Sequence, residues 1–441
     1  MNLRNELVKI CEENPEFKIK FSYQFWETDF LRFYQSQTNY NISKKSVSLG
    51  VTIYKGKKSY SFSLVNPDIK LLLEKIEETK KIINQLPEDP DFIDIEDNLT
   101  KNIEKEKENN IEKVSLEKKI NILEKISQAV APFEFKIFGT FICNYRTLYI
   151  INSNGVNKKE ISSPIMLELK AVSNKNEVTV LETFGSENIN VLDIDIFINN
   201  LVEKVKIAKE EIVDVDTGEY EVILAPRCMG EFLGYLTGNM NAQSLDNQNS
   251  FFEGKLDQKV FPEIFSLNDD PQNPELINFD YNDDGHIYEK LNLIEKGVFK
   301  NFFVDNYYGR KLKMKKNGAE GSALVMEIGD KTLSEMISGV KKGLYISSLH
   351  YMNFINFKET SVTGLTRDGT FLIEEGKLTK VVNNLRYTEK ISDVINGICE
   401  IENRSYTIPA SSNYGEFGIF SAKMPHVKVK GFKISSSTKT I

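Results

Sequence analysis

Residues Glu219–Met240, with the sequence EYEVILAPRCMGEFLGYLTGNM, carry the most structural information in this chain. Residues 219–224 alternate and are rich in β-forming side chains, and Pro226 then stands where proline is tolerated, in the first turn of a helix. The segment therefore predicts a strand that runs directly into a helix. Two rows of residues follow the helical repeat, one apolar and one of glycine: Met229, Leu233, Leu236 and Met240, and Gly230, Gly234 and Gly238.

The glycine row needs a physical reason. Each glycine inside a helix costs about 1 kcal/mol relative to alanine. The usual compensation is the close approach of another backbone. Two compatible interpretations follow: the helix packs tightly in an ordinary core, or it lines a peptide groove or a seam between subunits.

The same segment carries a family resemblance. The chain resembles the TldD/PmbA family and, within it, the TldE (PmbA-like) branch. In the TldD branch the helix contains His-Glu-x-x-x-His, in which the histidines bind zinc and the glutamate activates water. The corresponding places here are Gly234, Tyr235 and Asn239. Glycine has no ligand, a neutral phenol is a poor base near pH 7, and an amide is a weak zinc ligand.

Further motifs extend the resemblance over most of the chain, most weakly before about residue 110. The run 363–377, TGLTRDGTFLIEEGK, is closely similar to a signature of the TldE branch. The other segments are an Asn-Ser-x-Gly turn, a Phe-Asp-x-x-Gly type segment and a Glu-x-Gly-Val hairpin, at 152–155, 279–285 and 295–298. Their order and spacing are more specific than any one of them alone.

The run 363–369 has more hydrogen-bonding capacity than a plain turn requires. One interpretation is an internally satisfied turn with a network between Arg367 and Asp368. The other is a role in holding a substrate backbone or a partner strand. Together with the glycine row, the candidate binding residues are Gly230, Gly234, Gly238, Thr363, Gly364, Thr366, Arg367 and Asp368.

Composition describes a globular protein and excludes several classes. The chain has 441 residues, of which 40% are apolar and 27% charged, and no apolar run approaches the ~18 residues of a membrane span. A net charge of −8 argues against non-specific binding to nucleic acid or to an anionic membrane. The N-terminus lacks a secretory signal, and the four cysteines form no C-x-x-C pair. We therefore expect a cytoplasmic protein with reduced thiols.

The pattern along the chain predicts an α+β protein. Alternating strands followed by a helix indicate an N-terminal α+β domain at residues 1–86. A polar, charged linker at 87–112 separates it from a middle α+β domain at 113–215. Antiparallel sheets covered by helices are expected in both. Residues 216–441 read as a β-rich C-terminal domain with many short loops and with hairpins that turn at 295–297 and 374–377. The resemblance identifies this domain as the TldD/PmbA type.

No catalytic centre is evident in the sequence itself. The three histidines, His286, His350 and His426, are far apart, so no local metal motif exists. The run Asp283-Asp284-Gly285-His286 is the only cluster of carboxylate and imidazole groups in the sequence, and it fits either a polar turn or an unusual metal or catalytic site. The sequence has no Gly-x-Ser-x-Gly elbow and no Walker loop.

The resemblance implies the metal-free subunit of a TldD/TldE-type zinc metallopeptidase that degrades or matures unfolded peptides. The subunit would form part of the wall of an internal chamber in a heterodimer and would bind the backbone of the substrate. Zinc would be bound by the paralogous TldD-type partner. One alternative is a non-catalytic peptide-binding or scaffold homodimer. The other is an independent metallopeptidase with non-standard ligands such as His286 and Asp283.

Overall fold

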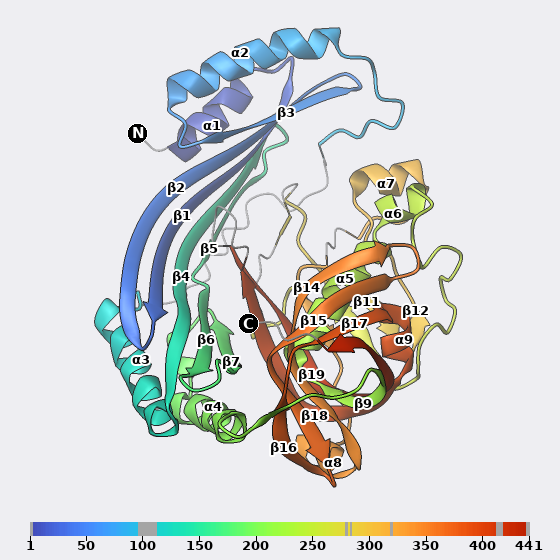
Figure 1. Cartoon of the computed structure of the whole chain (residues 1–441). Helices are drawn as coiled ribbons and strands as arrows, with labels where there is room; N and C mark the ends of the chain where they lie inside the picture. The colour runs from blue at the N-terminus through green and yellow to red at the C-terminus, as the bar shows by residue number, and fades with distance from the viewer. Residues whose placement is uncertain are drawn as a thin grey trace.

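The structure is a computed structural model that describes residues 3–95, 113–277, 281–282, 285–317, 321–411 and 418–437. Its strands form two sheets, which we call sheet A and sheet B, and helices lie against both (Figure 1). Most strand pairs are antiparallel. The predicted mixed α+β class is therefore confirmed.

Sheet A contains seven antiparallel strands in the order β3-β2-β1-β4-β6-β7, with β5 also paired to β4. The β1–β4 pair places Phe21 opposite Ile151, so strands from either side of the predicted linker 87–112 share one sheet. Residues 96–112 of that linker lie outside the described residues, and the domain boundaries stay a prediction. The strands are β1 (Lys18–Tyr34), β2 (Gln37–Lys55), β3 (Lys58–Val65), β4 (Phe135–Asn152), β5 (Asn157–Ser162), β6 (Ile165–Ser173) and β7 (Thr179–Ser186).

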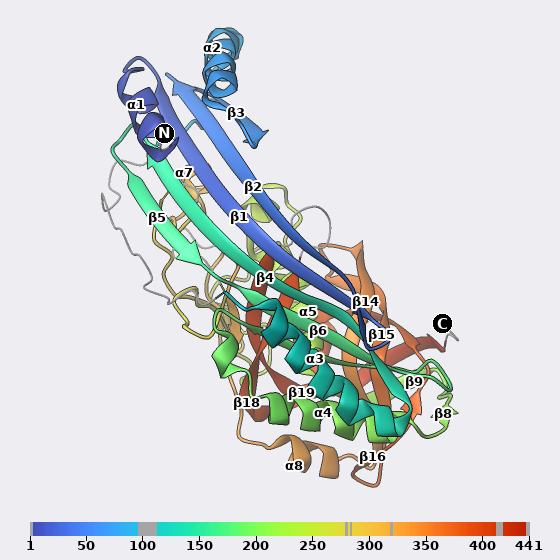
Figure 2. The same cartoon turned by 90° about the vertical axis from the view of Figure 1, so that its left-hand side faces the viewer.

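Four amphipathic helices cover one face of sheet A at its two ends (Figure 2). At one end, α1 (Leu3–Glu12) and α2 (Ile69–Gln85) pack on the face that carries Phe21. At the other end, α3 (Leu116–Val130) and α4 (Ile194–Ala208) pack on the same face of the strands. Helix α4 also contacts β16 of sheet B, so it lies between the two sheets.

Sheet B contains twelve strands along the order β12-β11-β10-β13-β19-β9-β14-β15-β16-β8, with β17 and β18 paired beside this path. Its β9–β14, β13–β19 and β16–β8 pairs are parallel. The strands are β8 (Ile212–Val213), β9 (Gly218–Leu224), β10 (Leu267–Asp269), β11 (Leu291–Glu295), β12 (Val298–Phe299), β13 (Leu324–Met326), β14 (Lys342–Asn356), β15 (Ser361–Glu374), β16 (Lys377–Val382), β17 (Leu385–Lys390), β18 (Ile398–Ser411) and β19 (Ile419–Ser437).

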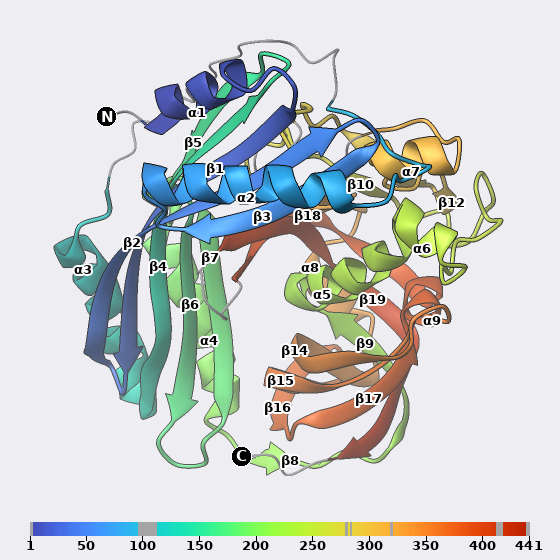
Figure 3. The ribbon, with the colours of Figure 1, turned by 90° about the horizontal axis from the view of Figure 1, so that it is seen from above.

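Five strands of sheet B close into a ring, because β9 pairs with β14, β14 with β15, β15 with β17, β17 with β19, and β19 again with β9. Helix α5 (Pro226–Thr237) leaves the ring at the end of β9 and packs against β14 and β19. Seen from above, α5 lies between the strands of the two sheets (Figure 3). The shorter helices are α6 (Ala242–Asp246), α7 (Asn306–Lys311), α8 (Leu333–Ser338) and α9 (Ile391–Asn396).

Both hairpins predicted in the C-terminal region are present. The β11–β12 hairpin turns at Lys296 and Gly297, and the β15–β16 hairpin turns at Glu375 and Gly376. All four turn residues have positive φ, the conformation of the tightest two-residue hairpin turns. In the part of the chain that the structure describes, no helix is both long and apolar enough to cross a bilayer.

Candidate functional site

The strand and helix predicted within residues 219–240 are confirmed as β9 and α5. Pro226 occupies the first turn of the helix, and the amide of Ala225 donates a hydrogen bond of 3.0 Å to the carbonyl of Ile346 on β14. The helix therefore begins where β9 is held against β14. The predicted apolar row is buried, with Met229, Leu233, Leu236 and Met240 all at 0% exposure.

The opposite side of α5 is its open face, which carries Arg227, Gly230, Glu231, Gly234, Tyr235 and Gly238. A Cβ atom added at Gly234 would have no other atom within 4 Å, and one at Gly230 would meet only Met424, at 4.0 Å. At Gly238 the nearest atom belongs to the Phe357 ring, at 3.5 Å. No backbone within the described residues approaches the row, so packing inside this chain does not explain the glycines.

The polar residues of the open face are also four apart, and two of them are anchored. Arg227 forms an ion pair of 2.9 Å with Glu168 on β6, which ties α5 to sheet A. The Tyr235 hydroxyl donates a hydrogen bond to the carbonyl of Met352 on β14. Glu231 lies between them and has no hydrogen bond or ion pair within the described residues.

The positions that correspond to the zinc motif do not fit a metal. Gly234 has no side chain, and the hydroxyl of Tyr235 is used by Met352. Asn239 is fully buried in the turn after α5, where its Oδ1 accepts a hydrogen bond of 2.9 Å from the amide of Phe251. Among the described residues, no group of three His, Cys, Asp or Glu side chains could hold a metal ion.

The three histidines lie apart, on different elements. His286 follows the turn of Asn282, whose Oδ1 accepts a bond of 3.0 Å from the His286 amide, and Asp283 lies outside the described residues. His350 is on β14, where burial lowers its pKa and the charges of Arg367 and Lys170 lower it further. His426 is on β19 and is the buried one.

His426 takes part in a buried network that sequence reasoning missed. Its Nδ1 lies 2.6 Å from Oε2 of Glu402, and its Nε2 lies 3.0 Å from the hydroxyl of Tyr345. Glu402 also accepts a bond of 3.0 Å from the Tyr406 hydroxyl. Burial opposes ionisation of Glu402, but the bonds from His426 and Tyr406 outweigh it and hold its pKa below the usual range.

Burial also lowers the pKa of His426, although Glu402 opposes this. A neutral imidazole with its proton on Nδ1 satisfies both neighbours, because it donates to Glu402 and accepts from Tyr345. The network joins β14, β18 and β19, and no hydrogen bond among the described residues links it to the open face of α5. We assign it to the stability of sheet B.

The run 363–369 lies on β15, which pairs with β14 on one side and β17 on the other. Because β17 pairs only with residues 361–365, the part of the run that is paired on both sides, and so lacks a free backbone edge, ends at Leu365. Thr366 is fully buried, and its Oγ1 accepts a bond of 3.0 Å from the amide of Leu385. Thr363 donates a bond of 3.0 Å to the carbonyl of Tyr387. These two candidates have structural partners.

The proposed network between Arg367 and Asp368 is not formed. Asp368 instead pairs with Lys170 on β6 at 2.7 Å and accepts a bond of 2.8 Å from Thr179 on β7. The run therefore connects sheet B to sheet A. The guanidinium of Arg367 is partly exposed and has no ion pair within the described residues, which leaves it as the side chain of this run able to meet a ligand.

Gly364 is required by packing. A Cβ atom at this position would lie 2.4 Å from the hydroxyl oxygen of Tyr387 and 2.7 Å from the ring carbon that bears it. Tyr387 is fully buried, and its ring also contacts Phe232 of α5 edge to face at 5.8 Å. The glycine at 364 thus lets a large aromatic side chain fill the space between β15 and α5.

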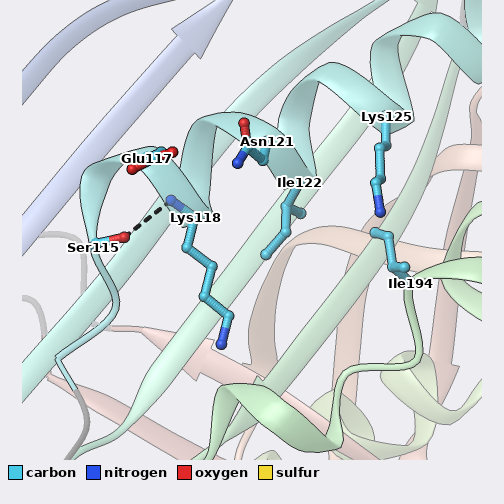
Figure 4. A pocket seen from close by; sticks show the side chains of 7 residues that line it. All are labelled: Ser115, Glu117, Lys118, Asn121, Ile122, Lys125 and Ile194. Carbon is cyan, nitrogen blue, oxygen red and sulfur yellow. Dashed lines mark hydrogen bonds between the residues drawn. The ribbon is translucent and has the colours of Figure 1, made fainter.

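A cavity of about 320 Å³ lies elsewhere, on α3 beside the start of α4 (Figure 4). Ser115 caps α3 there by accepting a hydrogen bond of 3.1 Å from the amide of Lys118. None of the predicted site residues contributes to this cavity. Its lining consists of Ser115, Glu117, Lys118, Asn121, Ile122, Lys125 and Ile194.

Known proteins resemble this chain in sequence and in fold. A family model described as the PmbA/TldA metallopeptidase C-terminal domain matches residues 217–436. A zinc metalloprotease TldD homolog of Saccharolobus solfataricus is 26% identical over 72% of this chain and 76% of its own length. Metalloprotease PmbA of Escherichia coli O157:H7 is 22% identical over 49% of this chain and 47% of its own length.

Solved structures show the same fold at low sequence identity. TldE from Thermococcus kodakarensis superposes with a TM-score of 0.83 at 17% identity and covers 98% of this chain and 99% of that one. A protein described as a modulator of a DNA gyrase from Thermotoga maritima gives a TM-score of 0.83 at 15% identity, with the same coverage. Fold, matched C-terminal region and curated relatives agree, and the chain belongs to the TldD/PmbA family of metallopeptidase-related proteins.

Proposed function

We propose that this chain is the metal-free, TldE-like subunit of a TldD/TldE-type zinc metallopeptidase. In this proposal the chain forms part of the chamber wall of a heterodimer and binds the backbone of an unfolded peptide. The TldD-type partner binds zinc and cleaves the peptide. The observation that carries the proposal is the open face of α5. The motif resemblance aligns α5 with the family's zinc helix, and the face offers open space in front of Gly230 and Gly234.

Backbone recognition explains why glycine is retained along α5. A row without side chains lets a peptide main chain approach the helix closely, whatever the sequence of that peptide. The helix is well placed for this, because Arg227 ties it to sheet A and Tyr235 ties it to β14. A face fixed at both ends loses little conformational freedom when a peptide binds.

Catalysis by this chain alone lacks support among its described residues. Gly234, Tyr235 and Asn239 do not supply zinc ligands, and His426 is committed to Glu402 and Tyr345. In the proposed complex the partner therefore carries out the zinc chemistry, and this chain binds the substrate. The cysteines are free and three of them are buried, which supports a reducing, cytoplasmic location.

The test is co-expression of this chain with a TldD-type chain from the same cell. We expect the two to purify together, and an unstructured peptide with a fluorophore and a quencher to be cleaved only when both are present. A chelator should abolish cleavage and added zinc should restore it. Metal analysis should find about one zinc per heterodimer and none in this chain purified alone.

Three outcomes would contradict the proposal. Full cleavage by the TldD-type chain alone would remove the need for this subunit. One zinc per chain in this protein purified alone would favour the independent metallopeptidase. Peptide binding by a stable homodimer that ignores the TldD-type chain would favour the scaffold protein.

A further inference from the structure

Glu231 is the charged group of the α5 open face that has no partner. Its neighbours one turn away on either side are committed: Arg227 pairs with Glu168 at 2.9 Å, and the hydroxyl of Tyr235 donates to Met352. Within the described residues, no donor or cation lies within bonding distance of the Glu231 carboxylate. The side chain is nevertheless partly buried against the helix surface.

A carboxylate in such a place is poorly stabilised. Burial raises the pKa of Glu231 to about 7; the nearby Arg227 opposes this rise and the charge of Glu168 adds to it. Removing a carboxylate from water without a counter-charge is costly, and a cation placed beside it would recover that cost. The titratable groups that face it are Arg227, Glu168, Tyr235, Cys228 and Tyr387. Only Arg227 among them is cationic; its Nη2 pairs with Glu168, and its buried Nη1 has no hydrogen-bond partner within the described residues.

A second unsatisfied group lies between α5 and β15. The hydroxyl of Tyr387 is buried and has no hydrogen-bond partner within the described residues, although the side chain is fully enclosed. Burial raises the pKa of Tyr387, and the charge of Glu231 is the next contributor, which places the two groups near each other. Buried hydroxyls are almost always hydrogen-bonded, so this end of α5 carries a second polar group, beside Glu231, that the described residues leave unsatisfied.

The glycine row supplies the space that such a ligand needs. Gly230 and Gly234 flank Glu231 on the helix surface, and Cβ atoms there would have no neighbour closer than 4.0 Å. A peptide lying along the row would bring its own groups past the carboxylate. A single carboxylate without further ligands does not hold a transition metal, whereas an ammonium group needs only acceptors.

We propose that Glu231 binds an ammonium group of a peptide that lies along the Gly230–Gly234–Gly238 row. This inference rests on the proposed function, since it assigns the substrate of that function a positive charge at one position. The ammonium group is either the N-terminal amine of the peptide or the side chain of a lysine. Its charge satisfies Glu231 without displacing Arg227 from Glu168.

The experiment measures binding of three fluorescent peptides to the full-length chain by anisotropy. All three are short, built from alanine and serine, and labelled at the C-terminus. The first has a free N-terminal amine, the second is N-acetylated, and the third is N-acetylated and contains one lysine. Each is titrated with the wild type, with Glu231→Gln and with the control Glu124→Gln, which removes an exposed, unpaired helical glutamate on α3.

We expect an amine-bearing peptide to bind wild type and Glu124→Gln about tenfold more tightly than the acetylated peptide, the effect of one charged hydrogen bond. Glu231→Gln should abolish this difference and leave acetylated-peptide binding unchanged. A preference for the first peptide identifies an N-terminal amine, and a preference for the third identifies lysine. Equal binding of all three peptides, or a preference that survives in Glu231→Gln, overturns the inference and leaves the proposed function standing. Binding of no peptide, to this chain or to its complex, overturns both.

Discussion

Lys170 on β6 lies 2.7 Å from the carboxylate of Asp368 on β15, and this ion pair connects sheet A to sheet B. Asp368 is 6% exposed and has a φ of 55°, a left-handed conformation that asparagine also tolerates. The hydroxyl of Thr179 on β7 donates to the same carboxylate at 2.8 Å. One side chain of the run 363–369 therefore holds two strands of the other sheet.

Asp368→Asn should destabilise the protein by about 1–3 kcal/mol, because it removes the charge of a buried carboxylate that binds both the partly exposed Lys170 and Thr179. The matched control is Asp257→Asn. Asp257 also has a positive φ, of 59°, and pairs with Lys300 at 2.5 Å, but it lies on the surface. Its loss should cost less than about 0.5 kcal/mol. Urea unfolding followed by circular dichroism measures both, and equal effects would refute a special role for Asp368.

Alanine at Gly234 and alanine at Gly364 should have opposite effects. A Cβ at Gly364 would lie 2.4 Å from the Tyr387 hydroxyl oxygen on a rigid ring, and overpacking of this kind costs about 1–3 kcal/mol. A Cβ at Gly234 would meet nothing within 4 Å, and alanine should stabilise the helix by about 0.5–1 kcal/mol. Thermal unfolding distinguishes the two variants.

The same Gly234→Ala variant also tests whether a peptide contacts the glycine row of α5. If a peptide backbone lies against the glycine row, the added methyl group should weaken peptide binding even though the protein becomes more stable. Anisotropy titration with the acetylated peptide gives the comparison. Unchanged peptide affinity in a stabilised variant would argue against contact at Gly234.

Two buried tyrosines give a matched pair for the value of a hydrogen bond. Tyr345→Phe removes the hydroxyl that lies 3.0 Å from Nε2 of His426, and leaves that buried nitrogen without a partner. This should cost about 1–3 kcal/mol. Tyr387→Phe removes a hydroxyl that has no hydrogen-bond partner within the described residues, so unfolding should show no loss of stability or a small gain. If Tyr387→Phe lowers the free energy of unfolding as much as Tyr345→Phe does, the Tyr387 hydroxyl must have a hydrogen-bond partner after all.

Glu231 should make stability depend on pH. Its pKa in the folded protein is about 7, above the ordinary value of 4.5, so the folded state holds the proton more tightly than the unfolded state. The contribution of Glu231 to the free energy of unfolding is therefore fully present below pH 4.5 and is lost as the pH rises through about 7. We expect this loss to be about 1–3 kcal/mol, because the side chain is partly exposed. Glu231→Gln should lack this loss, so its stability relative to the wild type should be greater at pH 8 than at pH 5.

Urea midpoints at both pH values provide this measurement, with Glu124→Gln as the control. Other groups titrate over the same range, among them Glu389, whose pKa burial raises to about 7. The difference between variant and wild type cancels their contribution. An identical pH dependence in the two proteins would show that Glu231 is ordinarily solvated.

Local patterns predicted the elements that depend on local forces. The alternation of 219–224, Pro226 and the apolar row fixed β9 and α5, and the glycine-containing turns at 295–297 and 374–377 fixed two hairpins. The motifs also indicated the family from the sequence alone. These features could be read because their partners lie within a few residues of each other.

The remaining features depend on partners far apart in the chain. The pairing of β1 with β4 crosses the predicted linker, and the Lys170–Asp368 ion pair joins residues nearly two hundred positions apart. Nothing in the spacing of Glu402 and His426 distinguishes a buried pair from two surface residues. Glu231 was likewise indistinguishable from any helical glutamate, because its lack of a partner is a property of the packed structure.

Strand β19 has a consequence for how the protein is made. It lies between β13 and β9 in sheet B and also pairs with β17 and β18, and all four of these partners precede it in the chain. The ring that carries α5 therefore stays open until residue 437 has left the ribosome. Until then β9 and β17 each have one edge whose backbone N–H and C=O groups lack a strand partner, a state prone to aggregation. Synthesis rate and chaperone supply, as well as sequence, should therefore govern the yield of folded protein.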